Sequence, residues 1–392
     1  MKVAFLTPSV SRALGGIYEI ERNLAQALVA STPTQLNVVG LEDEYTKDDL
    51  PEWAPLEPTV LPVTGPILFG YSPSLNDTLE TVDADLLHLH VLWRYTSVAS
   101  LRWHRQTGRP HLVTINGMLD QWAVQNARWK KRIAGWLYEH DNLREAGCLQ
   151  VNTEKEYRAV REYGIDTPTC IVPNGVTLPP DEAPSSPPWT DTIPSDQRVL
   201  LFLGRIHPKK GIFELATAWK QLRDTAPAVT DAWSVAIVGW DDGGHMNRLQ
   251  ERIEEAGLTE NLFILGPMFG EDKHAAFSHA DAFVLPSYSE GLPMAILEAW
   301  SYRLPVLLTP GCNLDVGLDW NAAAETRPDP DRLHADLRSF LNRPVDDHQT
   351  MGRQGRRLVE DQFTWTQVAQ QMYRVYQWML GDAPPPQTIR FD

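Results

Sequence analysis

The sequence predicts an α/β protein built from two Rossmann-like domains. Its 392 residues are more than one ordinary hydrophobic core encloses. Short apolar runs typical of buried strands alternate with amphipathic helical segments, once before and once after a proline-rich stretch. We therefore expect a first domain at 1–177, a linker at 178–195 and a second domain at 196–365.

Composition and charge narrow the class of protein. The chain is 43% hydrophobic and 22% charged, as in globular proteins, and its formal net charge is -16. Such an acidic chain argues against a general nucleic-acid binder. The three cysteines are scattered without zinc-site spacing, which indicates reduced thiols in the cytoplasm. We find no signal peptide and no apolar run long enough to span a membrane.

The first domain opens as a Rossmann-like unit does. Residues 3–6 form an apolar strand, Gly15 and Gly16 mark a turn, and a helix is expected at 17–30. The pattern Gly-x-Gly-x-x-Gly is absent here, so a dinucleotide-binding fingerprint is not supported. Further strands are expected at 38–41 and 59–62.

A strand at 85–90 ends in a histidine pair. His88 and His90 share one face because side chains alternate along a strand. Two histidines could bind a metal, but no third ligand is evident, so we expect no metal site. Ligands gather at the carboxyl ends of strands in open α/β sheets, which favours His90 as a site residue. A buried structural histidine is the alternative.

The next strand, at 111–115, runs into Asn116 and Gly117. An asparagine side chain both donates and accepts hydrogen bonds but does not titrate. Asn116 therefore suits binding and not acid–base chemistry. Further on, a strand at 149–153 precedes a helix at 154–163.

A tryptophan-rich segment follows Asn116. Trp122, Trp129 and Trp136 recur every seven residues, which places them on one helical face, and Arg128 and 130–132 make the segment basic. A helix packed into the core with a solvated basic face is the favoured interpretation. An interfacial helix on an anionic membrane is the alternative.

The second domain also opens with a strand, a turn and a helix, at 198–203, 204–211 and 212–222. This turn carries the cations Arg205 and Lys210 next to a helix N-terminus. Both features stabilise negative charge on a ligand. Further strands are expected at 233–238, 261–268 and 305–309, with helices at 247–256 and 272–280.

The most informative stretch is 286–298. It follows an apolar strand at 282–285, and Pro293 is expected at the first position of a helix. Backbone amides near Gly291 and Leu292 would attract phosphate. Glu290 and Glu298 frame that helix end, and a carboxylate accepts hydrogen bonds from neighbouring hydroxyls. Amides that bind phosphate beside carboxylates that bind hydroxyls suit a nucleotide-sugar.

Three motifs carry a resemblance to a known family. They are Pro-Ser-x-x-Glu-Gly with Glu-x7-Glu at 286–298, Gly-Arg-x-x-x-x-Lys-Gly at 204–211 and Val-Pro-Asn-Gly-Val at 172–176. Together they resemble the retaining glycosyltransferase family four, of the GT-B fold, from about Met1 to Trp378. The resemblance implies two Rossmann-like domains facing a central cleft. It also implies that a last helix at 366–382 returns to the first domain; we expect the tail from Pro384 to be disordered.

The resemblance also implies roles for single residues. The catalytic set would be His90, Arg205, Lys210 and Glu290. The donor would be bound by Gly15, Gly16, Arg205, Lys210, Met268, Glu290, Gly291, Leu292 and Glu298, with the nucleobase near Met268. The acceptor would be bound by Asn116 and Gly117, although many relatives carry histidine at position 116. No cofactor and no metal ion are expected, because Arg205 and Lys210 would neutralise the diphosphate.

By this resemblance the chain transfers sugar from a nucleotide-diphosphate-sugar, more commonly UDP-linked, to a glycan or lipid-linked acceptor. A nucleotide-sugar epimerase or hydrolase of the same fold is the first alternative. A non-catalytic relative that docks on membranes is the second. We expect a cytoplasmic protein without nucleic-acid partners, with peripheral contact at the inner face of the plasma membrane as a further option.

Overall fold

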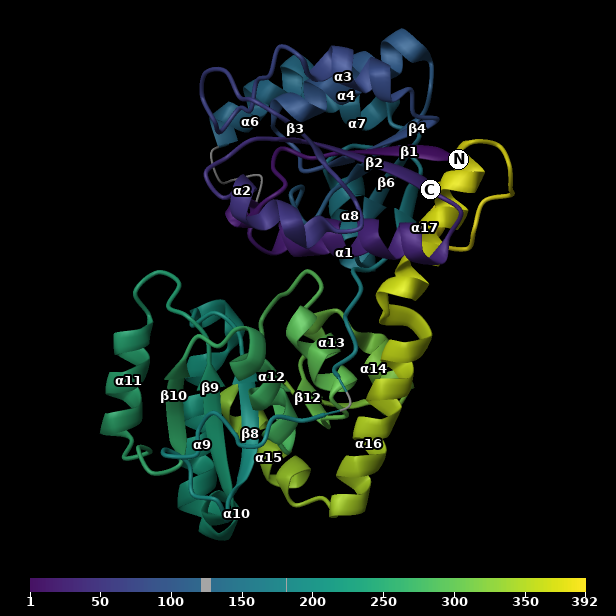
Figure 1. Cartoon of the computed structure of the whole chain (residues 1–392). Coiled ribbons are helices and arrows are strands. Elements are labelled where there is room, and N and C mark those ends of the chain that lie inside the picture. Colours follow the sequence, from purple (N-terminus) through teal and green to yellow (C-terminus); the bar gives the residue numbers. More distant parts are fainter. Residues whose placement is uncertain (121–127, 181) are drawn as a thin grey trace. The chain divides into compact units, whose positions relative to one another are not determined.

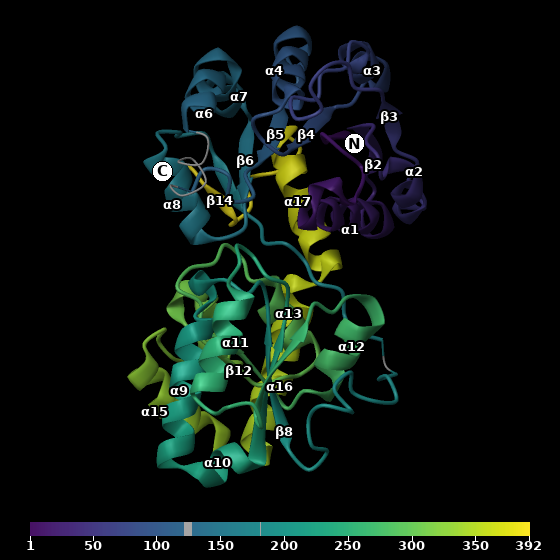
Figure 2. The same ribbon diagram turned by 90° about the vertical axis from the view of Figure 1, so that its left-hand side faces the viewer.

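The computed structural model describes residues 1–120, 128–180 and 182–392 (Figure 1). The chain forms two compact units, one of Met1–Gly175 with Trp365–Asp392 and the other of Val176–Thr364. Each unit is a twisted, mainly parallel sheet with helices on both faces (Figure 2). The predicted α/β class with two Rossmann-like domains is thereby confirmed. Among the described residues, no helix is long and apolar enough to cross a membrane.

The sheet of the first unit has the strand order β14-β7-β6-β5-β4-β1-β2-β3. All neighbouring pairs are parallel except β14 with β7. Its strands are β1 (Lys2–Leu6), β2 (Gln35–Leu41), β3 (Thr59–Leu61), β4 (Leu86–His90), β5 (His111–Thr114), β6 (Cys148–Val151), β7 (Thr169–Ile171) and β14 (Ile389–Arg390). Because β1 lies between β2 and β4, the direction of winding reverses between β1 and β4.

Alternation along β1 produces two cores, one on each face of this sheet. Val3 and Phe5 pack into one cluster, whereas Ala4 and Leu6 pack into the other. The first face is covered by α1 (Gly16–Ser31) and α17 (Trp365–Met379). The second face is covered by α3 (Leu75–Val82), α4 (Tyr95–Thr107), α7 (His140–Glu145) and α8 (Glu154–Glu162). The expected return of the last helix to this unit is confirmed.

The second unit has the strand order β10-β9-β8-β11-β12-β13, and all its pairs are parallel. The strands are β8 (Arg198–Leu203), β9 (Trp233–Val238), β10 (Leu262–Gly266), β11 (Ala282–Leu285), β12 (Val306–Leu308) and β13 (Ala323–Glu325). One face carries α9 (Ile212–Thr225), α11 (Met246–Glu255) and α15 (Pro330–Leu341) (Figures 1 and 2). The other carries α12 (Gly270–His279), α13 (Met294–Ser301) and α16 (Val345–Leu358). Winding reverses between β8 and β11.

Two expectations about proline-rich segments need correction. Residues 178–195, expected to be a linker, belong to the second unit, where Trp189 and Ile193 are buried in the core. The tail after Pro384 is ordered, because β14 adds an antiparallel edge strand in which Ile389 pairs with Cys170. In both segments a few apolar side chains that contact distant parts of the chain outweigh the local proline content.

The tryptophan-rich segment also differs from the favoured interpretation. It forms α6 (Arg128–Ala134), followed by a π-helical turn, η3 (Gly135–Glu139). Trp129 and Trp136 are exposed and are not packed in the core. The buried positions of this turn are instead Gly135 and Glu139, because Glu139 accepts a hydrogen bond from the Trp93 amide at 2.6 Å. Trp122 lies outside the described residues.

Candidate functional site

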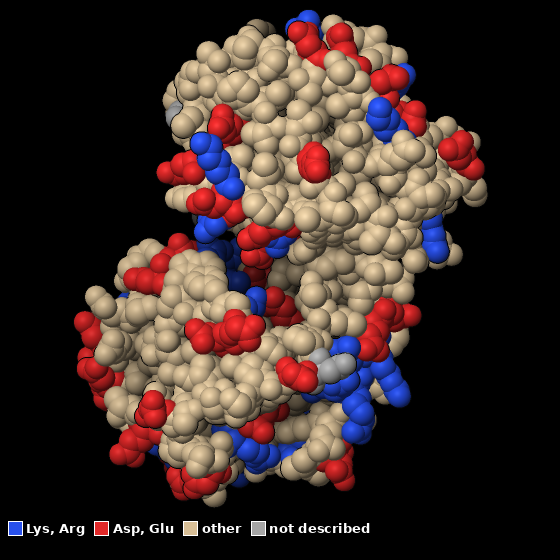
Figure 3. Space-filling model, viewed as in Figure 1, with Lys and Arg blue, Asp and Glu red and all other residues tan. Residues whose placement is uncertain are grey.

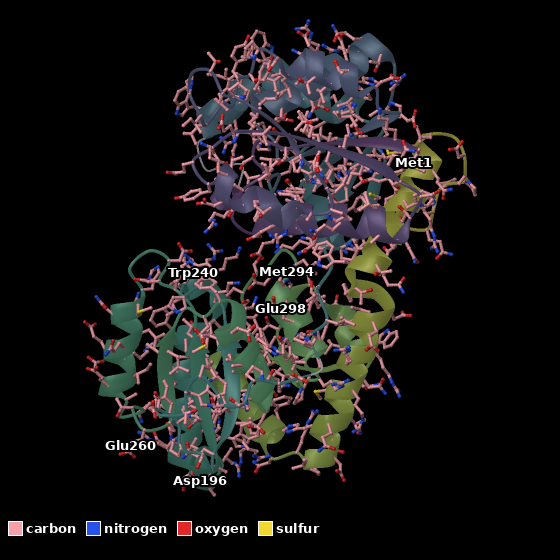
Figure 4. All side chains as sticks on the ribbon, in the orientation of Figure 1. Met1, Asp196, Trp240, Glu260, Met294 and Glu298 are labelled. Atoms are coloured by element: carbon pink, nitrogen blue, oxygen red, sulfur yellow. The ribbon has the colours of Figure 1, made fainter. Side chains whose placement is uncertain are left out.

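The predicted donor residues of the second unit lie at or beyond the carboxyl ends of its strands. Arg205 and Lys210 follow β8, and Glu290 follows β11, the strand paired with β8 on the side where the winding reverses. In open α/β sheets this switch point, at the carboxyl ends of the strands, is where ligands bind. Figure 4 shows Trp240, Met294 and Glu298 at this end of the unit, whereas Asp196 and Glu260 lie at the opposite end.

A close approach of backbones joins the loops that follow β8 and β11. Gly211 has φ +68, and a Cβ at this position would lie 2.0 Å from the carbonyl oxygen of Pro286. The Tyr288 amide donates to the carbonyl oxygen of Lys209 at 2.9 Å. Only glycine fits both the left-handed conformation and this contact. The glycine of the basic turn therefore holds Lys210 against the loop that carries Glu290.

Lys210 and Glu290 form an ion pair between the loops that follow β8 and β11. Lys210 Nζ lies 2.6 Å from Glu290 Oε1, and the Ser287 hydroxyl donates to the same oxygen at 2.5 Å. The side chains are 15% and 12% exposed. Little water screens a pair buried to this extent, so the attraction between the two charges is strong. The structure thus brings together two predicted site residues that lie 80 positions apart.

The loop after β12 fixes the backbone of Glu290. The Glu290 amide donates to the Gly311 carbonyl at 2.7 Å, and Asn313 Nδ2 donates to the Glu290 carbonyl at 2.6 Å. A Cβ on Gly311 would lie 2.5 Å from the carbonyl oxygen of Tyr288. The sequence analysis did not identify these contacts. Gly311 and Asn313 hold the backbone of Glu290 in place and so limit the positions of its carboxylate, as supporting residues do in preorganised sites.

Arg205 is held more loosely than Lys210. Its guanidinium lies 2.7 Å from Asp242, and both side chains are largely exposed. Exposed pairs of this kind are worth only about 0–1 kcal/mol. The backbone next to Arg205 is better fixed than its side chain, because the amide of Ile206 donates to the Trp240 carbonyl at 2.8 Å. Arg205 can therefore exchange Asp242 for an anionic ligand at little cost.

Glu298 points from α13 toward α12. Its Oε1 lies 2.5 Å from Lys273 Nζ, a partner that the sequence analysis missed. Burial, followed by the carboxylates of Glu298 and Glu271, raises the pKa of Tyr302 to about 12. Glu298 therefore forms part of a group of polar side chains between the two helices and is not an isolated surface carboxylate.

Gly291 and Leu292 lie just before α13, whereas Met268 lies at the end of β10, on the other side of β8 and β9. Gly291 is exposed, and Leu292 is half-buried against the core of the unit. The helix begins at Met294, with Pro293 as its N-cap and not as its first residue. Among the described residues, no side chain caps this end. Met268 follows β10 and packs partly on the core, beside the exposed Phe269, whose ring stacks on Trp240 at 6.4 Å.

In the first unit, His90 lies at the carboxyl end of β4, beside the point where the winding reverses. It is buried, its ring stacks on His88 at 4.0 Å, and it contacts Phe5 at 4.5 Å. Burial lowers the pKa of His90 to about 3. The imidazole is therefore neutral at pH 7, so it can exchange hydrogen bonds but carries no charge.

The partners of the two histidines differ. His88 is structural, because its ring nitrogens lie 2.7 Å from the Tyr376 hydroxyl and 2.6 Å from the Thr114 hydroxyl. Neither ring nitrogen of His90 has a hydrogen-bond partner within the described chain. The Oε1 atom of Glu21 lies 3.9 Å from His90 Nδ1, beyond hydrogen-bond distance. An unsatisfied polar ring at a strand end is a feature of ligand sites, since such groups are costly when buried.

Glu21 is a residue that the sequence analysis missed. It is fully buried, and this burial raises its pKa well above that of an ordinary glutamate. The signal was present in the sequence. Glu21 occupies a position on the buried stripe of α1, with Tyr18, Leu24 and Leu28, where helical periodicity predicts an apolar side chain.

The predicted acceptor residues follow β5, whereas the glycine pair lies at the start of α1, after β1, and β4 lies between these two strands. Gly15 and Gly16 are exposed at the start of α1, and a Cβ on either would meet open space. Asn116 has φ 46 and follows β5, where its Oδ1 accepts from Asn152 at 3.4 Å. Gly117 has φ 70 and lies near Glu156. Within the described ranges no group of three or more potential metal ligands occurs.

Comparison with protein families gives two matches in succession. Residues 15–175 match a family described as glycosyl transferase 4-like domain, and residues 188–358 match glycosyl transferases group 1. Among curated relatives, the D-inositol 3-phosphate glycosyltransferase of Corynebacterium jeikeium is 28% identical over 61% of this chain and 59% of its own length. That of Geodermatophilus obscurus is 32% identical over 43% of this chain and 39% of its own length. The chain thus spans less than two thirds of these relatives.

Solved structures share the fold at low identity. Sucrose-phosphate synthase from Thermosynechococcus elongatus superposes with a TM-score of 0.74 at 19% identity, covering 98% of this chain and 100% of that one. Anabaena HepE in complex with UDP gives a TM-score of 0.74 at 18% identity, covering 96% and 100%. A protein from Listeria monocytogenes described as a UDP-N-acetylglucosamine 2-epimerase gives 0.63 at 13%, covering 98% of each chain. At these identities the likeness concerns the fold alone.

Proposed function

The chain belongs to the glycosyltransferases of the GT-B fold, since two glycosyltransferase families match its two domains in turn, and from this premise we propose its reaction. It transfers a sugar from a nucleotide-diphosphate-sugar, with retention of configuration, to a glycan or lipid-linked acceptor. UDP is the favoured nucleotide, because HepE, a structure of the same fold, was solved with UDP. The observation that carries the proposal is the ion pair of Lys210 with Glu290 at the switch point of the second sheet.

The proposed roles follow from charge and position. Arg205 and Lys210 would meet the diphosphate, whose negative charge grows as the glycosidic bond breaks. Cations stabilise that charge most in the transition state. Glu290, fixed by Gly311 and Asn313, would accept hydrogen bonds from the sugar hydroxyls. Glu298 would accept from the ribose hydroxyls, with Lys273 as its support.

The roles proposed for the first unit concern the acceptor. His90, neutral and unsatisfied at the end of β4, would hydrogen-bond an acceptor or sugar hydroxyl. Asn116 and Gly117 would bind the acceptor through amide and backbone groups. Because burial lowers the pKa of His90 to about 3, its imidazole is a weak base, and the proton of the acceptor hydroxyl would pass to the leaving phosphate. This is the front-side route, in which the new bond forms on the face that the diphosphate leaves.

The first test is calorimetric binding of UDP, GDP, ADP and dTDP to the wild type and to Glu298→Ala. We expect tight binding of one diphosphate, weakened in the variant because its ribose loses an acceptor. Glu271→Ala is the matched control, because Glu271 is an exposed carboxylate near the same Tyr302. If none of the four binds, the donor site is not where we place it. Equal affinity in all three proteins would remove Glu298 from ribose binding.

A second test separates transfer from epimerisation, because an epimerase shares this fold. The nucleotide-sugar that corresponds to the bound diphosphate is incubated with the protein in the absence and presence of candidate acceptors. Acceptor-dependent release of diphosphate, with the sugar in a retained linkage, supports transfer. A changed nucleotide-sugar without any acceptor would support the epimerase instead.

A further inference from the structure

An exposed apolar patch on the first unit surrounds the segment that follows β4. We define it as the apolar rim, formed by Trp129, Ile133, Trp136 and Leu137 on α6 and η3, and Ile67 and Leu68 in the loop before α3. Trp136 is 82% exposed, Leu68 78%, Ile67 71% and Trp129 66%. Single exposed apolar residues are normal, but a group of large ones marks an interaction surface.

The start of α4 links the two parts of the rim. On one side, the Tyr95 amide donates to the Phe69 carbonyl at 2.8 Å, and Arg94 donates to the Leu68 carbonyl. On the other side, the Trp93 amide donates to Glu139 at 2.6 Å. The loop of Ile67 and Leu68 and the turn of Trp136 and Leu137 are therefore tied to the same three residues.

The internal contacts of the helix leave its apolar residues directed outward. Gly135 and Glu139 are buried, and a Cβ on Gly135 would lie 2.7 Å from the His140 ring. Asn142 Nδ2 donates to Glu139 at 2.8 Å. Because these positions fix the buried side of the turn, Trp136 and Leu137 face solvent. Within the described chain, the largest apolar side chains of this turn are therefore exposed.

The charge of this segment is opposite to that of the protein. Residues 121–138 contain four basic residues and no acidic one, in a chain with a formal net charge of -16. Acidic side chains are spread over the face shown in Figure 3. Within the rim, Arg132 is exposed and Lys131 lies over the Trp93 ring at 5.7 Å. In a symmetric dimer formed through the rim, these basic residues would face their own copies and repel each other, so the local charge favours a different, anionic partner.

We propose that the apolar rim docks the first unit on the surface of an anionic phospholipid bilayer. Tryptophan is enriched at membrane interfaces because its ring is apolar and its N–H is polar. Basic residues beside it are attracted to anionic headgroups, and together they give surface binding without spanning. This proposal does not depend on the transfer reaction proposed above, because it is tested without substrate.

The test is flotation of the full chain with vesicles of phosphatidylcholine alone, or of phosphatidylcholine with phosphatidylglycerol, at two salt concentrations. We expect binding to the anionic vesicles, weakened by salt because screening shortens the range of the charges. Each basic residue near an anionic surface contributes roughly a fivefold factor in partitioning. Arg132→Glu changes the local charge by two, so it should lower partitioning roughly 25-fold.

Matched variants separate the rim from general effects. Trp136→Ser with Leu137→Ser should abolish most binding, whereas Val345→Ser and Arg357→Glu, exposed on α16 of the second unit, should leave it unchanged. Unchanged melting temperatures would show that all variants fold. Three results would overturn the proposal: no binding to either vesicle, equal binding to both, or equal loss in the α16 variants. Dimerisation through the rim, abolished by the double variant without any lipid binding, would instead assign the surface to a second copy.

Discussion

Replacement of Lys210 by methionine is the perturbation that most directly tests the site. Methionine keeps much of the length of the side chain and removes its charge. A cation about 4 Å from a phosphate charge interacts by about 4 kcal/mol at an effective dielectric constant of about 20. Removal of one preorganised electrostatic group typically costs about 3–4 kcal/mol, and side chains here are not fully buried, so we expect about 2–4 kcal/mol. That range corresponds to a decrease of roughly 30- to 900-fold in kcat/KM.

Lys209→Met provides an internal control. Lys209 is exposed, and only its backbone carbonyl contacts the loop after β11, through the Tyr288 amide. Both variants remove one positive charge from the same turn, so long-range electrostatics change equally. The assay is steady-state release of the nucleoside diphosphate, with its affinity measured by calorimetry. We expect Lys209→Met to retain activity within about threefold, because exposed charges are largely screened.

The double variant Lys210→Met with Glu290→Gln separates two explanations of a loss. The first variant removes the Lys210 charge from Glu290 and leaves the Ser287 hydroxyl in place. If the loss in diphosphate affinity came from the charge of Glu290 once Lys210 is removed, neutralising Glu290 would restore affinity. If Lys210 binds the diphosphate itself, affinity stays low in the double variant. Near-normal turnover in Lys210→Met, or equal losses in the two lysine variants, would refute the reasoning.

Two further predictions concern stability. Trp189→Ala should destabilise the second unit by about 3–5 kcal/mol in a denaturant melt, because it empties a core position in the segment 178–195; a change below about 1 kcal/mol would restore the view of that segment as a linker. Burial raises the pKa of Glu139 to about 7, so the native state binds more protons than the unfolded chain between pH 4.5 and 7. Its contribution therefore falls as pH rises through this window, by up to about 3 kcal/mol. Relative to Glu139→Gln, the wild type should lose stability from pH 4.5 to 7, and a pH-independent difference would contradict this.

Local sequence patterns predicted most of the fold. Apolar runs such as 198–203 and 233–238 are strands at these bounds in the structure, because fully buried parallel strands need continuous apolar residues. The patterns failed where few residues make distant contacts. Two apolar side chains among prolines were enough to bury part of 178–195, and the edge strand β14 depends on pairing with β7, more than 200 positions earlier. Neither contact leaves a periodic signal.

The tryptophan segment shows a different limit. A seven-residue repeat predicts that Trp129 and Trp136 share a face, but it does not say whether that face is buried. In the π-helical turn at Gly135–Glu139 the buried positions are a glycine and a hydrogen-bonded glutamate, and the large apolar side chains are exposed. A buried glutamate is unexpected from composition. The outward position of the apolar residues therefore follows from polar contacts that only the structure provides.

At the candidate site the sequence identified most of the charged residues but not how they pair. Arg205, Lys210 and Glu298 stand out because they lie in loops and helix ends with a physical reason to bind anions or hydroxyls. In the structure each has an opposite charge beside it: Asp242, Glu290 and Lys273. These pairs differ in exposure and hence in the cost of opening them. A diphosphate would meet Arg205 first at almost no cost and would compete with Glu290 for Lys210 afterwards. Release of Glu290 from Lys210 would then give the sugar hydroxyls their acceptor only when the diphosphate is already bound.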